Sequence, residues 1–204
     1  MQAKPKKIRI AVQKDGRLKD ETFAFLETFG LKFIFGNDRN LITSSTNNKV
    51  ELLHVRHSDI PQYVQSGAAE LGIVGANVLA ETNFTVKEIK RLSFGKCRLV
   101  IAVPENSKIK TIADLAGERI ATSHTESLRK FLKKNKIHAS IVEIKGSVEI
   151  ATELNLSDAI CDITQTGKTL KEHRLKEIAV VYESEATLIQ STLEVDENIL
   201  EKLI

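Results

Sequence analysis

The chain has 204 residues, enough for one substantial hydrophobic core or for two small lobes. Hydrophobic residues make up 42% of it and charged residues 28%, which is ordinary for a globular protein and excludes a long disordered segment. The net charge of +3 suits anionic small molecules and requires no nucleic acid. The N-terminus has no signal-peptide pattern and no apolar run approaches bilayer length, so we expect a soluble, cytoplasmic protein without a membrane or nucleic-acid partner.

The two cysteines, Cys97 and Cys161, are far apart, and each lies in an apolar run typical of a strand. This spacing offers neither a zinc knuckle nor a CxxC redox pair, so both are expected to be buried thiols. No pair among the five histidines has a metal-ligand context. We therefore predict no metal site built from protein side chains.

Strand and helix patterns alternate along the chain. Apolar, β-branched runs predict strands over residues 8–12, 31–35, 41–43, 50–56, 70–75, 86–92, 97–103, 120–122, 141–144, 159–163, 178–183 and 187–190. Apolar residues at helical spacing predict helices ending at 30, between 59 and 67, from 76, and over 112–115, 126–134, 148–154 and 195–204. Such alternation predicts an α/β fold.

Charged residues lie at the ends of several predicted strands. Lys14 and Arg17 flank a glycine after the first strand, Arg56 ends the strand over 50–56, and Glu70 begins the next. Because open α/β sheets bind ligands at strand ends, Arg56 and Glu70 are candidate ligand-binding residues. Lys14 and Arg17 are well placed for an anion, and ordinary surface charge is the alternative.

The stretch DAICDITQTGKTL, residues 158–170, combines a buried strand pattern with a polar loop that leads into a helix pattern. Such a turn aims backbone N–H groups and hydroxyls at one point, and Gly167 permits close backbone approach. A phosphate suits that point, and Asp162 could accept hydrogen bonds from ribose hydroxyls. An ordinary strand-to-helix turn with threonine caps is the alternative.

Two further segments, GAAELGIVG at 67–75 and TIADLAGERIAT at 111–122, resemble sequences of periplasmic-binding-protein-like lobes. Proteins of this type II fold hold a ligand between two α/β lobes that crossing strands connect. The resemblance implies a two-lobed α/β fold with the active cleft between the lobes. We expect residues 1–92 plus 177–204 to form one lobe and residues 93–176, with the polar loop, to form the other.

Taken together, six ordered motifs resemble the catalytic region of the ATP phosphoribosyltransferase family over nearly the whole chain. They are IAVQKDGRL (10–18), LLHVRHSDIP (52–61), GAAELGIVG (67–75), FGKCRL (94–99), GSVEIA (146–151) and DAICDITQTGKTL (158–170). Glu70 stands where the family usually has Asp, and Gln165 and Lys168 occupy variable loop positions. The resemblance implies transfer of phosphoribosyl from phosphoribosyl pyrophosphate to N1 of ATP, the first step of histidine biosynthesis, with Mg²⁺ carried mainly by the phosphates.

The resemblance also implies roles for individual residues. The phosphoribosyl pyrophosphate loop would comprise Asp162, Ile163, Thr164, Gln165, Thr166, Gly167, Lys168 and Thr169. The catalytic residues would be Lys14, Arg17 and Arg56, which neutralise pyrophosphate and triphosphate, and Glu149, which orients the ribose or the attacking base. The ATP-binding residues would be Lys14, Arg17, Glu70, Cys97 and Arg98.

The family implies a homodimer and, for a chain of this length, a short form that works with a regulatory subunit resembling histidyl-tRNA synthetase. A truncated long form would give a similar sequence, and that alternative stays open. Two other functions are also open. One is a solute-binding module of the same fold, against which the absent export signal and the polar loop count. The other is a salvage phosphoribosyltransferase, in which two adjacent acids would precede the threonine-rich loop, whereas Asp158 and Asp162 are four residues apart.

Overall fold

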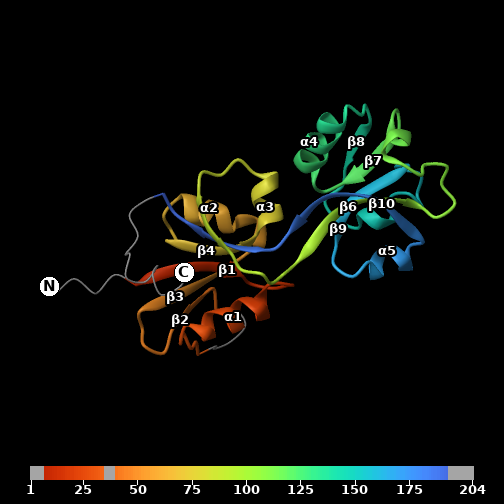
Figure 1. Ribbon diagram of the computed structural model, residues 1–204. Coiled ribbons are helices and arrows are strands. Elements are labelled where there is room, and N and C mark those ends of the chain that lie inside the picture. Colours follow the sequence, from red (N-terminus) through yellow and green to blue (C-terminus); the bar gives the residue numbers. More distant parts are fainter. Residues whose placement is uncertain (1–6, 35–39, 193–204) are drawn as a thin grey trace. The chain divides into compact units, whose positions relative to one another are not determined.

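The computed structural model describes residues 7–34 and 40–192 (Figure 1). The chain divides into two compact units. The first comprises Met1–Leu79, Asn83–Gly95 and Glu185–Ile204, and the second comprises Ala80–Thr82 and Lys96–Ser184. The predicted helix over 195–204 lies outside the described residues, as does Phe35 of the strand predicted over 31–35.

The first unit contains one mixed sheet with strand order β2-β3-β1-β4-β11-β5, in which β3, β1 and β4 are parallel. Its strands are β1 (Ile8–Gln13), β2 (Ile42–Ser44), β3 (Val50–Val55), β4 (Leu71–Gly75), β5 (Lys87–Arg91) and β11 (Ala186–Gln190). Its helices are α1 (Lys19–Thr28), the 3₁₀ turn η1 (His57–Asp59), α2 (Ile60–Gln65) and α3 (Ala76–Glu81), whose last two residues group with the second unit.

The second unit contains a five-stranded sheet with order β10-β6-β9-β7-β8, in which β9, β7 and β8 are parallel. Its strands are β6 (Cys97–Pro104), β7 (Arg119–Thr122), β8 (Ser140–Glu143), β9 (Ala159–Thr164) and β10 (Leu175–Ser184). Its helices are η2 (Ile112–Leu115), α4 (Thr125–Asn135), η3 (Val148–Ile150) and α5 (Lys168–Glu172).

Both sheets are covered on their two faces, because apolar side chains occupy both sides of the central strands. In β6, Leu99 and Ile101 pack in the cluster that contains Leu128 of α4, whereas Val100 packs in the cluster that contains Leu170 of α5. Figure 1 shows α4 and α5 on opposite faces of this sheet. Burial on both faces produces the nearly continuous apolar runs that predicted these strands.

In the first unit, β4 is buried at all five positions. Helix α2 packs closely over it, since a Cβ added at Gly72 would lie 2.8 Å from side-chain atoms of both Ile60 and Val64. The glycine therefore sets how near the helix lies to the sheet, because any larger side chain would push the helix away.

The structure corrects two predicted elements. Among residues 31–34, Phe33 forms an isolated bridge with Ser45 in place of a strand. The helix predicted over 148–154 is the short η3 followed by turns, and left-handed residues bound the segment on both sides, Ser147 at φ 49° and Asn155 at φ 55°. A helix cannot be continued through such residues.

The boundaries of the two units also differ from those expected. The return to the first unit occurs after Ser184 and not after residue 176, because β10 pairs with β6 along its whole length. Residues 80–82 group with the second unit because the Glu81 carboxylate accepts hydrogen bonds from the N–H groups of Glu126 and Ser127, at 3.0 and 2.9 Å. Glu81 thereby caps the N-terminus of α4, where a negative charge is favourable.

A glycine near the boundary provides a test of packing in the first unit. Gly95 has φ of 63°, and an added Cβ would collide with Cδ2 of Leu18, which is fully buried. We expect Gly95→Ala to lower the free energy of unfolding by about 2–4 kcal/mol, from backbone strain plus overpacking. Urea denaturation followed by circular dichroism measures this loss.

Gly117→Ala is the matched control, since Gly117 also has positive φ, 84°, but no atom lies within 4 Å of an added Cβ. Gly117→Ala should lower the free energy of unfolding by the backbone strain alone, about 1–2 kcal/mol. Equal losses in the two variants would contradict a packing role for Gly95.

Candidate functional site

In the first unit, the carboxyl ends of the parallel strands bring together three of the predicted cations. Gln13 pairs in register with Val55, and the Lys14 N–H donates to the Val55 carbonyl at 2.9 Å. Lys14 and Arg56 therefore follow neighbouring strands at the same edge of the sheet. Arg17 lies in the turn between β1 and α1; Lys14 and Arg17 are half-buried, and Arg56 is exposed.

The turn that carries Lys14 and Arg17 is held by local hydrogen bonds. Gln13 donates from Nε2 to the carbonyl of Asp15 at 2.6 Å, and the Lys19 N–H donates to the carbonyl of Gly16 at 3.2 Å. Gly16 has φ of 112°, which favours glycine. These contacts fix the backbone of the turn from which Lys14 and Arg17 project.

His54 lies behind this turn, a position that sequence reasoning left among surface or capping histidines. Its ring is buried, and Nε2 lies 3.0 Å from Oγ1 of Thr43. Burial lowers the pKa of His54, and the nearby charges of Lys19 and Lys14 lower it further. His54 is therefore neutral at pH 7. The signal in the sequence is its alternation with Leu52 on the inward face of β3.

Glu70 lies apart from these cations. It precedes β4, and its carboxylate accepts the N–H of Arg9, near the start of β1, at 2.9 Å. Because β1 and β4 are parallel, this is the amino edge of the sheet, and the six residues of β1, roughly 20 Å long, separate it from Lys14. Glu70 and Arg56 thus both lie near strand ends, but at opposite edges of the sheet.

In the second unit, one edge of the sheet gathers the remaining predicted residues. The parallel strands β7, β8 and β9 end there, and the antiparallel strand β6 begins there, with Arg98 directly opposite Thr164. The loop after β9 and the segment after β8 that carries Glu149 therefore lie at the same edge. Asp162 and Glu149 are close enough for each charge to act on the other.

The loop after β9 is shaped by its own hydroxyls. Thr164 Oγ1 accepts the Gly167 N–H at 3.0 Å, and Thr166 Oγ1 accepts the Lys168 N–H at 3.4 Å. Gly167 has φ of 75°, with open space around it. Its neighbours Gln165, Thr166, Lys168 and Thr169 are exposed. The predicted helix is a single turn, α5, so the loop itself must provide most of any anion site.

The Asp162 carboxyl has a pKa that is raised by its surroundings. Burial raises the pKa of its carboxyl, while a hydrogen bond from the Ile163 N–H and the proximity of His124 lower it, and Glu149 raises it. The Ile163 N–H donates to Oδ1 at 2.8 Å. A half-buried carboxylate such as Asp162 suits a sugar, because a carboxylate strongly accepts hydrogen bonds from hydroxyl groups.

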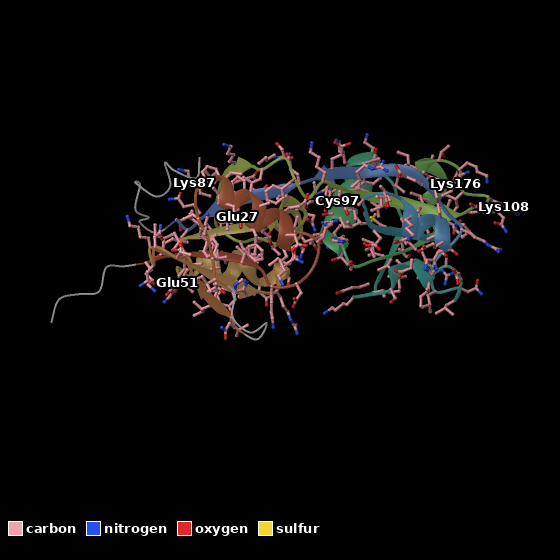
Figure 2. All side chains as sticks on the ribbon, turned by 90° about the horizontal axis from the view of Figure 1, so that it is seen from below. Glu27, Glu51, Lys87, Cys97, Lys108 and Lys176 are labelled. Atoms are coloured by element: carbon pink, nitrogen blue, oxygen red, sulfur yellow. The ribbon has the colours of Figure 1, made fainter. Side chains whose placement is uncertain are left out.

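Two residues predicted to bind ATP have structural contacts at the start of β6. Arg98 forms a bidentate ion pair with Glu177 of β10, at 2.9 and 3.0 Å. Cys97, labelled in Figure 2, is 4% exposed, and both cysteines are buried, as predicted. Burial raises the pKa of the Cys161 thiol well above its usual range.

The described part of the chain contains no group of three or more His, Cys, Asp or Glu residues that could hold a metal ion. Asp162 and Glu149 provide carboxylate oxygens, which are the ligands Mg²⁺ prefers, but Mg²⁺ binds with substrate phosphates rather than in such a pair alone. These residues fit a cation that arrives with a phosphorylated substrate.

The buried charge of Asp162 has a measurable cost. Because its pKa is raised in the folded state, stability falls as the pH rises from the unfolded-state pKa through the raised value. Asp162→Asn should therefore raise the unfolding midpoint at pH 7, and the gain should vanish below about pH 3, where the carboxyl is protonated in both states. Thermal unfolding at the two pH values measures this.

Asp158→Asn should have the opposite effect on the unfolding midpoint from Asp162→Asn. The Asp158 carboxylate accepts hydrogen bonds from Arg119 at 2.9 and 3.0 Å, and this pairing lowers its pKa. Its stabilisation is present above the unfolded-state pKa and is lost as the pH falls, so Asp158→Asn should lower the midpoint at pH 7. Destabilisation by both variants would contradict our view of Asp162.

Comparison with known proteins identifies the family. The family model described as HisG, ATP phosphoribosyltransferase, matches residues 56–204. An ATP phosphoribosyltransferase of Bacteroides thetaiotaomicron is 45% identical over 199 residues, which are 97% of this chain and 70% of that protein. One of Phocaeicola vulgatus is 46% identical over 182 residues, 89% of this chain and 64% of that protein. The chain thus spans about two thirds of these curated relatives.

Solved structures that resemble this chain include a member of the same family. A chain of the ATP phosphoribosyl transferase (HisG:HisZ) complex from Thermotoga maritima superposes with a TM-score of 0.78 at 27% identity, over 96% of each chain. The alkanesulfonate-binding protein SsuA from Xanthomonas axonopodis superposes with a TM-score of 0.58 at 16% identity, over 93% of this chain and 67% of that one. The second match concerns the fold alone, and together they confirm the predicted two-lobed, periplasmic-binding-protein-like α/β fold.

Within residues 7–34 and 40–192, no helix has the length and apolar character needed to cross a bilayer. The family match covers most of the chain, and the relatives contain nearly all of it. The resemblance predicted from the six sequence motifs is confirmed: the chain belongs to the ATP phosphoribosyltransferase family.

Proposed function

We propose that the chain transfers the phosphoribosyl group of phosphoribosyl pyrophosphate to N1 of the adenine of ATP and releases pyrophosphate, the first step of histidine biosynthesis, in the cytoplasm. The observation that carries the proposal is the position of the half-buried Asp162 carboxylate directly before the hydroxyl-rich loop after β9, in a chain of this family.

The edge of the second unit would bind the ribose 5-phosphate part of the substrate. Asp162 would accept hydrogen bonds from ribose hydroxyls, and the loop from Ile163 to Thr169 would hold the 5-phosphate. The Gly167 backbone, in open space, permits close approach of a phosphate. Glu149 would orient the ribose or the attacking base from its position near Asp162.

The cations of the first unit would stabilise the leaving group. Breaking the bond between C1 of the ribose and pyrophosphate creates positive charge at C1 and negative charge on the pyrophosphate. Fixed cations lower the barrier of such a step, because they interact more strongly with the transition state than with the substrate. Lys14, Arg17 and Arg56 would do so, and Lys14 and Arg17 would also contact the ATP triphosphate.

Adenine N1 is unprotonated near neutral pH, so the reaction needs no strong general base. The protein then contributes mainly by orienting N1 toward C1. Cys97 would line the adenine side of the site, while Arg98 would act through its ion pair with Glu177. Glu70 lies at the other sheet edge and is not part of the proposed site.

Mg²⁺ would enter with the pyrophosphate of the substrate, and its chemistry would be to neutralise the charge that develops on that leaving group. Asp162 and Glu149 are the carboxylates at the second unit's edge that would contact the cation. The lack of a larger acidic cluster in the described residues makes the phosphates its main ligands in the proposal.

The proposal includes partners. A homodimer and a regulatory subunit resembling histidyl-tRNA synthetase follow from the family, and the similar Thermotoga maritima chain belongs to a HisG:HisZ complex. A solute-binding module is the second candidate, since the fold is shared with SsuA. Binding of a solute without formation of any product would favour this solute-binding function over the transferase.

The test is a near-ultraviolet absorbance assay that contains ATP, phosphoribosyl pyrophosphate, Mg²⁺ and inorganic pyrophosphatase. A rise in absorbance that requires both substrates is the expected result, because ribosylation at N1 changes the adenine chromophore. Absence of a rise, together with absence of phosphoribosyl pyrophosphate binding in calorimetry, would overturn the proposal. Binding without a rise would indicate that turnover depends on the regulatory subunit.

Arg56 provides the sharpest variant. Arg56→Ala should lower kcat roughly a hundredfold, because a fixed positive charge at the leaving group is lost. Its free energy of unfolding should stay within about 0.5 kcal/mol of the parent, since the side chain is exposed. Arg91→Ala, which removes an exposed arginine from β5, is the control and should leave kcat unchanged. Unaltered turnover in Arg56→Ala would remove Arg56 from the proposed site.

A further inference from the structure

The side chain of His124 is held at the same sheet edge as the proposed phosphoribosyl site. Its backbone N–H donates to Oγ1 of Thr122 at 2.9 Å, and that hydroxyl donates to the carbonyl of Cys161 at 2.6 Å. Thr122 and Cys161 are partners in the β7–β9 register. His124 is therefore tied to the strand position immediately before Asp162.

The two nitrogens of the His124 ring differ in their surroundings. Nδ1 is buried and finds no hydrogen-bond partner in the described part of the chain, whereas Nε2 is not enclosed in this way. An N–H group that is buried without an acceptor is costly. The neutral tautomer with its proton on Nε2 is therefore favoured, and it presents a donor at the accessible side of the ring.

Burial keeps this tautomer neutral, although the charges nearest to His124 are negative. Burial lowers the pKa of the imidazole, and the carboxylates of Glu81 and Asp162 offset this only in part. Both Glu81 oxygens accept backbone N–H groups of α4, from Glu126 and Ser127. Protonation would place a second N–H at the buried Nδ1, so the ring remains a neutral donor at pH 7.

We propose that His124 is a further substrate-binding residue, which donates its Nε2–H to the oxygen of a ribose hydroxyl of the phosphoribosyl substrate. The inference rests on the proposed function and deepens it. A sugar hydroxyl both donates and accepts hydrogen bonds, but the Asp162 carboxylate can only accept. With Asp162 as acceptor and His124 as donor, one hydroxyl is bound in both capacities, and a deoxy sugar at that position loses both bonds.

The experiment is calorimetric titration of the full chain with phosphoribosyl pyrophosphate and Mg²⁺. His124→Phe keeps the ring volume but removes the donor, and it should raise the Kd at least about tenfold, as expected for loss of a hydrogen bond in a charged site. His124→Gln places an amide N–H near the position of Nε2 and should stay within about threefold of the parent. His138→Gln, at an exposed histidine, is the control and should bind as the parent does.

A second measurement observes the His124 ring of the parent protein directly. In the parent protein labelled with ¹⁵N-histidine, ring spectra should show His124 protonated on Nε2, and addition of phosphoribosyl pyrophosphate with Mg²⁺ should shift the Nε2 resonance. The spectrum of His124→Gln identifies the signal by its absence. Inorganic phosphate, which would bind the loop alone, should leave this resonance unchanged.

The outcomes separate the inference from the proposed function. If the parent does not bind phosphoribosyl pyrophosphate, both are overturned. If the parent binds but His124→Phe binds equally well, or Nε2 does not respond, only the role of His124 is wrong. If Gln weakens binding as much as Phe in a folded protein, the ring has a structural role and not a donor role.

Discussion

The parallel pairing of three strands in each unit is the constraint on which both candidate edges depend. Parallel strands end at the same edge, so whatever follows β3 and β1 in the first unit, or β7, β8 and β9 in the second, is brought together without any sequence motif that links the segments. Lys14 and Arg56, which are 42 positions apart in the sequence, become neighbours in this way. Glu149 and Asp162 gain their proximity by the same rule.

Each edge combines exposed polar groups with an ionisable group that is buried behind them. In the first unit this is His54, kept neutral beneath a turn with two cations; in the second it is Asp162, kept charged at a cost next to a neutral histidine. The Asp162 arrangement opposes stability, since burial of a charge is unfavourable unless the charge is well paired. The position of both groups at strand ends is consistent with a site selected for binding rather than for folding.

The fold class and most of the strands were predicted correctly from the sequence. Strands that are buried on both faces have nearly continuous apolar sequences, such as LGIVG and CRLVIAV, which are easy to recognise. Prediction failed where geometry depends on partners distant in the sequence. The edge on which Glu70 lies follows from strand direction, and Arg98 forms its salt bridge with Glu177 of β10, a residue that is opposite Ala102 in the strand register. The unpartnered ring nitrogen of His124 likewise depends on the packing around it, which no local pattern encodes.

The position of β11 determines the order in which the chain can fold. This strand, residues 186–190, lies between β4 and β5 in the first sheet, so that sheet is complete only after the ribosome has synthesised nearly all of the described chain. Until then, β4 exposes an unpaired edge of five apolar or glycine residues, the kind of edge that recruits other chains. The second unit is almost contiguous in the sequence, so its sheet does not depend on a strand that is synthesised much later. Its early folding would shorten the loop that the late strand must close.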